Sequence, residues 1–228
     1  MLPLPAAARR RATVGIIVPP MNVHLPPLAY ATLQRFVHGD HWRSFGLFTR
    51  TLDLSPGETV VEIGCGIGSL APHFIEQGFD YWGLDVDASR VEVAQRRNTG
   101  GTFLVCDALD LATAGLPPFR RVFIHGVLHH MADAECRQIF DRTLALQPDM
   151  VLSLIEPYRP DPWWSNPLGS AFSSFDEGIH VRTLEQWRAL TRPNAVTFEQ
   201  FTLWPRWPVG FLVARLVQAQ PTRRERQV

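Results

Sequence analysis

Residues 60–70, VVEIGCGIGSL, place three glycines at alternate positions between two apolar runs. Glycine inside a strand or helix costs about 0.5–1 kcal/mol relative to alanine, so these positions carry a stability cost. The flanking apolar residues predict a buried strand at 60–63 and a helix at 69–77. We interpret the stretch as a strand-to-helix turn with exposed backbone N–H groups, where a ligand approaches without obstruction from Cβ atoms.

The segments after this turn alternate between strand-like and helix-like patterns. We expect four more strands and three more helices, with Asp87 and Asp133 as candidate N-caps: strands at 81–84, 102–106, 121–125 and 150–155, and helices at 88–97, 133–146 and 184–190. Such alternation is typical of βαβ units and a parallel sheet.

Two strand-like runs close the chain, at 196–203 and 209–217, and only residues 204–208 separate them. That gap is too short for a parallel crossover, so the pair predicts an antiparallel hairpin. We therefore expect an α/β fold with a Rossmann-like, doubly wound sheet of seven strands. The sheet is mostly parallel, ends in the antiparallel hairpin and follows an N-terminal helical cap.

The domain organisation predicted from these patterns has four parts. They are a flexible N-terminal tail at 1–26, a helical cap at 27–57, the α/β domain at 58–217 and a basic C-terminal tail at 218–228. The tail at 1–26 is rich in arginine and faintly resembles a transit peptide, but its prolines oppose an amphipathic helix.

Composition limits the function classes. The 228 residues have a formal net charge of zero, which argues against nucleic acid as the main partner. Three widely spaced cysteines form no disulfide or metal pattern, so we expect a reducing, cytoplasmic location. No apolar run reaches the length of a membrane span. The oligomeric state stays open.

Acidic residues follow the next two predicted strands. Asp85 ends the second strand and can accept hydrogen bonds from both ribose hydroxyls of an adenosine. Asp107 ends the third strand and can accept one from the exocyclic amine of adenine. The carboxyl ends of parallel strands meet at one edge of a sheet, so the glycine turn and the two carboxylates predict an adenosine cleft at that edge. Residues 66–71, GIGSLA, also match GxGxxA, which leaves a dinucleotide as an alternative.

Four motifs in order make the chain similar to class I S-adenosylmethionine-dependent methyltransferases of the small-molecule type. They are EIGCGIG at 62–68, LDVD at 84–87, CDA at 106–108 and IHGVLHH at 124–130. The first is the (Asp/Glu)-x-Gly-x-Gly-x-Gly signature, read with Glu62 at the end of the strand. The resemblance covers residues 56–217 and implies that 58–217 is an S-adenosylmethionine-binding domain.

The resemblance also implies which residues bind the cofactor. The glycines border the methionine moiety, Asp85 holds the ribose, Val86 and the Asp107–Ala108 pair meet the adenine, and His125 and Gly126 offer backbone groups to the methionine amine. Glu62 acts on the cofactor indirectly, through water or backbone contacts. The full set is Glu62, Gly64, Gly66, Gly68, Asp85, Val86, Asp107, Ala108, His125 and Gly126.

Histidines are the candidate catalytic groups, because imidazole is the natural base near neutral pH. His129 and His180 are our candidates for contact with the methyl acceptor, whereas His130 corresponds to a histidine that often supports the loop. Some related enzymes bind a divalent metal through an ExxEH run at this place. Gly126 and His129 replace both glutamates here, so we expect no metal, although Glu156 and His180 leave a different site open.

The predicted function is methyl transfer to a small-molecule acceptor, with O-methylation of an aromatic or partly apolar metabolite favoured. The long connection at 157–180 predicts the acceptor pocket, with Trp163, Trp164, Phe172 and Phe175 as lining candidates. Two alternatives stay open. One is an NAD(P)-dependent oxidoreductase, and the other is a degenerate methyltransferase fold that serves as a non-catalytic interaction module.

Overall fold

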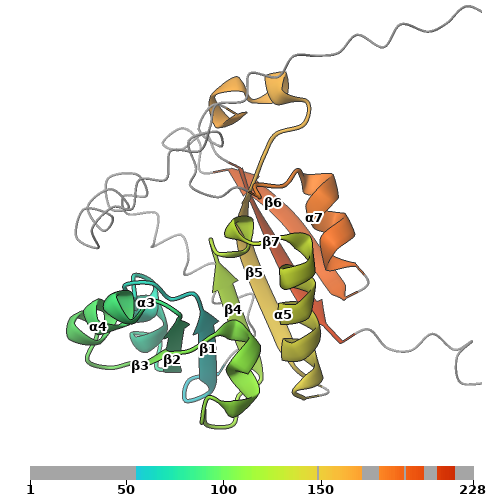
Figure 1. The fold of residues 1–228 in the computed structure, drawn as a ribbon. Helices are drawn as coiled ribbons and strands as arrows, with labels where there is room; N and C mark the ends of the chain where they lie inside the picture. The colour runs from blue at the N-terminus through green and yellow to red at the C-terminus, as the bar shows by residue number, and fades with distance from the viewer. Residues whose placement is uncertain (1–54, 148, 171–179, 193, 203–209, 219–228) are drawn as a thin grey trace, which may run out of the picture.

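Seven strands form one sheet in the order β3-β2-β1-β4-β5-β7-β6 in a computed structural model of the chain (Figure 1). The structure describes residues 55–147, 149–170, 180–192, 194–202 and 210–218. The predicted tail at 1–26 and nearly all of the predicted cap and C-terminal tail lie outside this range. So do Phe172 and Phe175.

The strands and helices agree closely with those predicted from the sequence. The strands are β1 (Thr59–Ile63), β2 (Asp80–Asp85), β3 (Thr102–Val105), β4 (Arg121–His125), β5 (Val151–Tyr158), β6 (Ala195–Thr202) and β7 (Gly210–Val217). The α-helices described are α3 (Ala71–Ile75), α4 (Ala88–Arg97), α5 (Asp133–Ala145) and α7 (Leu184–Thr191), with short 3-10 helices η2 (Ala108–Thr113), η3 (Leu128–His130) and η4 (Trp163–Ser165).

The sheet has a parallel part and an antiparallel part. Strands β1 to β5 pair in parallel, whereas β7 runs antiparallel to both β5 and β6. The prediction of a seven-stranded, mostly parallel sheet with a closing hairpin is therefore confirmed. Strand β5 extends to Tyr158, beyond the predicted end at residue 155, because β7 continues to pair with it as far as Gly210.

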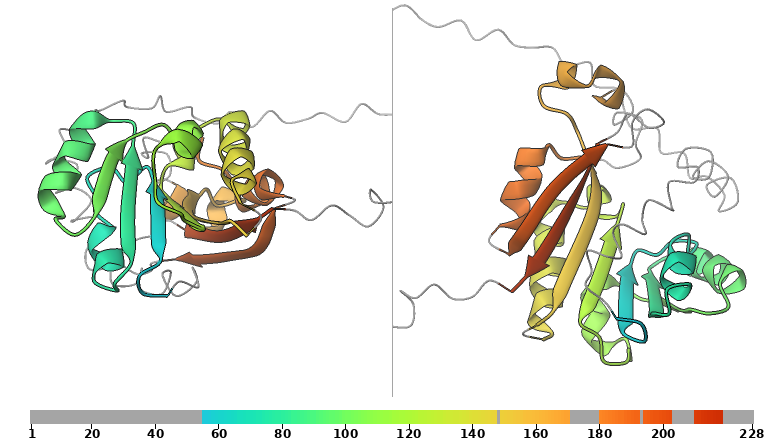
Figure 2. Two further views of the ribbon diagram at one scale, coloured as in Figure 1. Left: turned by 90° about the horizontal axis from the view of Figure 1, so that it is seen from below. Right: turned by 180° about the vertical axis from the view of Figure 1, so that it is seen from behind.

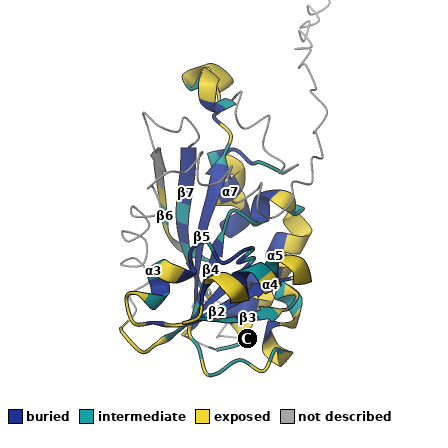
Figure 3. Cartoon of the chain, turned by 90° about the vertical axis from the view of Figure 1, so that its left-hand side faces the viewer, coloured by how far each residue is buried: buried dark blue, intermediate teal, exposed yellow. Residues whose placement is uncertain are grey.

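Helices cover both faces of the sheet (Figures 1 and 2). Neighbouring residues of β1 show the division, since Val60 packs with α3 and α4 on one face and Val61 packs with α5 and α7 on the other. The central strands are buried, whereas the segment around η4 projects beyond the sheet and is exposed (Figure 3). The two cores fix the sheet as a rigid support for the loops at its carboxyl edge.

One of the two predicted helix caps is correct. Asp87 precedes α4, and its carboxylate accepts hydrogen bonds from the N–H groups of Ser89 and Arg90. The prediction of Asp133 as a cap is wrong, because the N-cap of α5 is Ala132 and Asp133 is already helical. The side chain of Asp133 instead pairs with Arg182, 49 positions further along the chain.

No helix in the described ranges combines the length and the apolar character needed to cross a membrane.

Candidate active site

The glycine turn between β1 and α3 is folded onto the end of β2. The N–H groups of Gly64 and Cys65 both donate to the carbonyl of Leu84, at 2.7 and 2.9 Å. The N–H of Gly68 donates to Cys65 within the turn, at 2.9 Å. The expectation that these N–H groups are exposed is therefore wrong, because the end of β2 accepts from two of them and the turn itself accepts from the third.

All three glycines of the turn have left-handed backbones, with φ angles of +74° at Gly64, +54° at Gly66 and +70° at Gly68. Gly64 and Gly66 differ in their surroundings. A Cβ atom at Gly64 would overlap the side chain of Val127, whereas a Cβ at Gly66 would meet no atom of the described residues within 4 Å. Gly66 therefore borders open space at the carboxyl edge, and Gly64 allows the loop after β4 to approach closely.

Asp85 faces the glycine turn from the end of β2. Its Oδ2 accepts from the N–H of Gly66 at 2.8 Å and its Oδ1 from the N–H of Asp87 at 2.9 Å. The side chain is buried, which fixes its orientation. Each carboxylate oxygen has about two acceptor positions, so both oxygens retain the capacity for a further hydrogen bond.

The next strand ends carry apolar surface beside this carboxylate. Val86, directly after Asp85, is 69% exposed, and Val105 at the end of β3 is 57% exposed. Asp107 follows β3 and is the N-cap of η2. Its Oδ1 accepts from the N–H of Leu109 at 2.8 Å. Ala108 is partly buried against the core. An exposed valine beside a fixed carboxylate can contact a flat ring while the carboxylate accepts from hydroxyl groups of the sugar attached to that ring.

Glu62 lies below the turn, buried within β1. Its carboxyl accepts a 2.5 Å hydrogen bond from the hydroxyl of Tyr81. Burial raises the pKa of Glu62 to about 8, against the lowering effect of the Tyr81 hydrogen bond and with a smaller rise from Asp85. Glu62 is therefore mostly protonated near neutral pH.

The loop after β4 starts at Gly126, whose φ is +62°. The N–H of Gly126 donates to the carbonyl of Ile155 on β5 at 2.9 Å, which continues the sheet by one bond. That N–H is committed to the protein. An amine ligand is a hydrogen-bond donor and requires a carbonyl acceptor, so this N–H could not serve it in any case.

Glu156 holds this loop from β5 and is fully buried. Its Oε1 accepts from the N–H groups of Val127 and Leu128, both at 2.9 Å. Its Oε2 accepts from the N–H of His129 at 3.3 Å and contacts Nδ1 of the same imidazole at 2.9 Å. The sequence predicts Glu156 only as an alternative metal ligand. The signal for its role is an acidic residue in a mostly apolar strand, VLSLIEPY.

The two candidate catalytic histidines approach each other at this loop. His129 is 6% exposed, and its ring packs against that of His130 with centroids 4.0 Å apart. The backbone N–H of His180 donates to the carbonyl of His129 at 2.9 Å. Among the residues that the structure describes, no group of three or more His, Cys, Asp or Glu side chains has the arrangement of a metal site.

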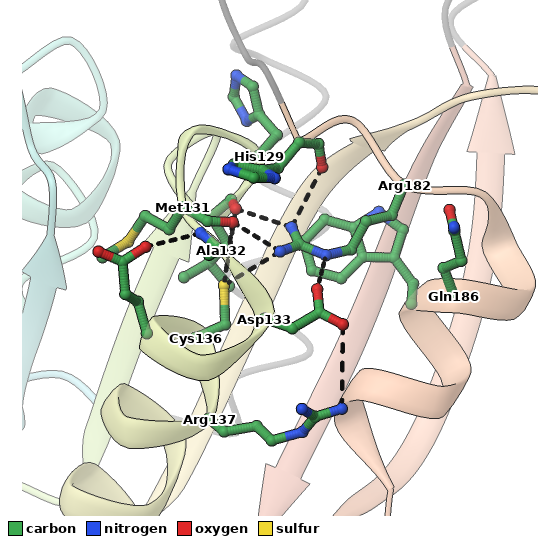
Figure 4. Close-up of polar contacts among 12 residues, drawn as sticks. His129, Met131, Ala132, Asp133, Cys136, Arg137, Arg182 and Gln186 are labelled. Atoms are coloured by element: carbon green, nitrogen blue, oxygen red, sulfur yellow. Dashed lines mark hydrogen bonds and ion pairs between the residues drawn. The ribbon is translucent and has the colours of Figure 1, made fainter.

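Arg182 is a second residue that the sequence did not reveal (Figure 4). Its guanidinium is buried beside His129, donates to the carbonyls of Leu128 and Met131, and pairs with Asp133 at 2.8 Å. The sequence offers only a weak signal for it, because an arginine before a helix is usually exposed.

The sequence and the fold are both similar to known methyltransferases. Residues 60–147 match the family described as a methyltransferase domain. A curated relative, an uncharacterized methyltransferase of Synechocystis, is 27% identical over 141 residues, which span 60% of this chain and 66% of the relative. The match thus covers just under two thirds of that protein's length.

Solved structures show the same fold at low sequence identity. Human N-acetylserotonin methyltransferase, in complex with S-adenosylmethionine, has a TM-score of 0.63 at 19% identity, over 84% of this chain and 56% of the other. Magnesium protoporphyrin IX methyltransferase from Synechocystis, with bound S-adenosylhomocysteine, has a TM-score of 0.59 at 17% identity, over 82% and 87%. This chain spans little more than half of the human protein.

Proposed function

We propose that this chain, which has the fold and the domain match of a class I S-adenosylmethionine-dependent methyltransferase, transfers a methyl group from S-adenosylmethionine to a small-molecule acceptor. We further propose that the acceptor atom is oxygen and that the acceptor is aromatic or partly apolar. The observation that carries the proposal is Asp85, fixed at the glycine turn beside the exposed Val86.

The described residues fit this cofactor. The two oxygens of Asp85 match the two ribose hydroxyls, and Val86 offers an apolar contact to the adenine. The open space above Gly66 accommodates the methionine side of the molecule. Asp107, Ala108 and the carbonyls of residues 125 and 126 complete the proposed binding set from the neighbouring strand ends.

A dinucleotide fits this turn less well. Pyrophosphate needs N–H donors at the glycine turn, but the N–H groups of Gly64, Cys65, Gly66 and Gly68 are bonded within the protein. The carboxylate of Asp85 also lies against Gly66, where it would repel a phosphate and attract a positively charged ligand. Both features favour a sulfonium nucleoside.

His129 is the proposed base. The cofactor, when bound, supplies an activated methyl group, so the chain must orient the acceptor and remove its proton. Glu156 accepts from Nδ1, which makes Nε2 the basic nitrogen of the His129 ring. The same carboxylate stabilises the imidazolium that forms when His129 takes a proton from an acceptor hydroxyl. His180, whose backbone is bonded to His129, remains the second candidate for acceptor contact.

The acceptor side of the proposal rests on aromatic surface. Trp163 and Trp164 are 62% and 66% exposed, and their rings pack edge to face with centroids 6.0 Å apart. Large exposed aromatic side chains favour an aromatic or partly apolar partner. The free cysteines Cys65, Cys106 and Cys136 are compatible with the proposed cytoplasmic location.

The cofactor is tested by calorimetric titration of the full chain with S-adenosylhomocysteine. We expect binding by the wild type and a loss of at least about tenfold in affinity for Asp85→Ala, since two charge-assisted hydrogen bonds are removed. Asp80→Ala is the matched control, because Asp80 is an exposed aspartate at the other end of β2. Equal heats for wild type and Asp85→Ala would contradict the proposal.

The reaction is tested by a metabolite screen with a labelled methyl donor. We expect label to enter hydroxylated aromatic compounds, and His129→Ala to lower the rate by about 10²–10⁴-fold, the usual contribution of a general base. His73→Ala, at a half-buried position in α3, serves as the control. Label found only in amines, or an unchanged rate in His129→Ala, would overturn the oxygen and base assignments respectively.

A further inference from the structure

The guanidinium of Arg182 has an acceptor for each of its five N–H donors. Its Nε bonds Asp133 at 2.8 Å, and the two NH₂ groups reach the carbonyls of Leu128, His180 and Met131 at 2.9, 3.2 and 2.6 Å. The fifth acceptor is the sulfur of Cys136 at 3.7 Å. A lysine has three donors on one nitrogen and cannot reproduce this planar arrangement.

The acceptors on the loop after β4 bracket His129. Arg182 holds the carbonyl directly before it and the carbonyl two positions after it, at Leu128 and Met131 (Figure 4). The carbonyl of His129 itself accepts from the N–H of His180. Residues 180–182 therefore support the carbonyl side of the loop, while Glu156 supports its N–H side.

Stability alone gives no reason to bury a charged side chain here. Arg182 is 5% exposed and lies over the ring of Trp187, 4.8 Å from its centroid. Replacing buried ion pairs by apolar side chains is often neutral or stabilising. What an apolar residue cannot do is donate hydrogen bonds to three backbone carbonyls at once.

We propose that Arg182 is a positioning residue for His129. Its guanidinium fixes the carbonyls on both sides of His129, so that the imidazole remains on Glu156. This inference rests on the proposed function, in which His129 is the base. Its expected signature is local, since the hydrogen bonds of Arg182 described above reach the loop after β4, Asp133, Cys136 and His180, and none of them reaches the glycine turn.

The test uses the full chain with S-adenosylhomocysteine and three readouts. They are the Nδ1–H signal of His129 in proton–nitrogen NMR, amide exchange at residues 127–129, and ligand affinity by calorimetry. For Arg182→Met and Arg182→Lys we expect loss of the Nδ1–H signal, amide exchange faster by at least about tenfold, and affinity within about threefold of wild type. Arg137→Met is the matched control, because Arg137 contacts Asp133 from the surface at 3.9 Å.

Two results would overturn the inference. One is a folded Arg182 variant that keeps the His129 signal and slow exchange. The other is a uniform loss of exchange protection and ligand affinity, which a merely structural residue would cause. If Arg182→Met does not fold, Arg182→Lys decides the matter, since it retains the charge. If the wild type binds no S-adenosylhomocysteine, the proposed function fails, and the signal and exchange rates of the free protein still test Arg182.

Discussion

The glycine turn after β1 and the loop after β4 lie at the same edge of the sheet but are held in different ways. The turn is shaped by its own glycines and by Asp85 on the adjacent strand. The loop is held by Glu156 and Arg182, whose charged groups bond its N–H groups and its carbonyls. One site element depends on local backbone freedom, the other on buried side chains far along the chain.

Glu156→Gln is expected to have the largest effect on folding. The amide would place N–H donors against the N–H groups of the loop, so buried donors would lose their acceptor. We expect the free energy of unfolding to fall by about 3–5 kcal/mol, measured by urea denaturation. Glu185→Gln, at an exposed position in α7, is the control and should stay within about 0.5 kcal/mol of wild type. Equal losses in both would show that the loop does not depend on Glu156.

Glu62 should make the turn sensitive to pH. Because its pKa is raised to about 8 in the folded state, folding favours the protonated form, and stability falls as the pH rises from about 4.5 to 8. We expect Glu62→Gln to remove a decrease of about 3 kcal/mol between pH 5 and pH 7.5, measured by denaturation at each pH. If the free energy of unfolding changes with pH in the same way in wild type and variant, this prediction is wrong.

Gly64→Ala tests the contact between the two regions. The new Cβ would overlap Val127, which is fixed by its bond to Glu156, and the left-handed backbone adds strain. We expect a loss of about 2–3 kcal/mol and a lower melting temperature. Gly115→Ala separates the two causes, because its φ is +69° but its Cβ would meet no atom within 4 Å. Similar losses in both variants would show that backbone strain alone, without the overlap with Val127, causes the destabilisation.

Gly66→Ala should have the smallest effect on folding and a clear effect on binding. Its Cβ would enter open space, so we expect a loss of only about 1 kcal/mol from backbone strain. The same methyl group would occupy the proposed cofactor space, and S-adenosylhomocysteine affinity should fall at least about tenfold. A variant that binds as tightly as wild type would place the cofactor elsewhere.

The comparison also explains what could be predicted from the sequence. The alternating strands and helices and the closing hairpin are confirmed, and residues 60–147 match a methyltransferase domain, because each leaves a pattern within a few neighbouring residues. Asp85 lies next to Gly66 because β1 and β2 pair in parallel, which brings their carboxyl ends together. The roles of individual cofactor and catalytic residues, and the domain boundaries, remain predictions.

The supports of the loop after β4 were not predictable in the same way. Glu156 bonds residues 27–29 positions away and Arg182 reaches back as far as 54 positions, so no local pattern links them to the loop. Asp133 illustrates the difficulty. Its position before a helical pattern suggests a cap, but its carboxylate pairs with the distant Arg182 instead.

The distance between the loop and its supports has a consequence for truncated forms of the protein. The family match ends at residue 147, before both Glu156 and Arg182. A fragment cut to that boundary would retain every glycine of the turn and both aspartates, yet residues 127–131 would lack the carboxylate and the guanidinium that immobilise them. During synthesis, likewise, the chain must be translated as far as residue 182 before the carbonyls on both sides of His129 can be bonded.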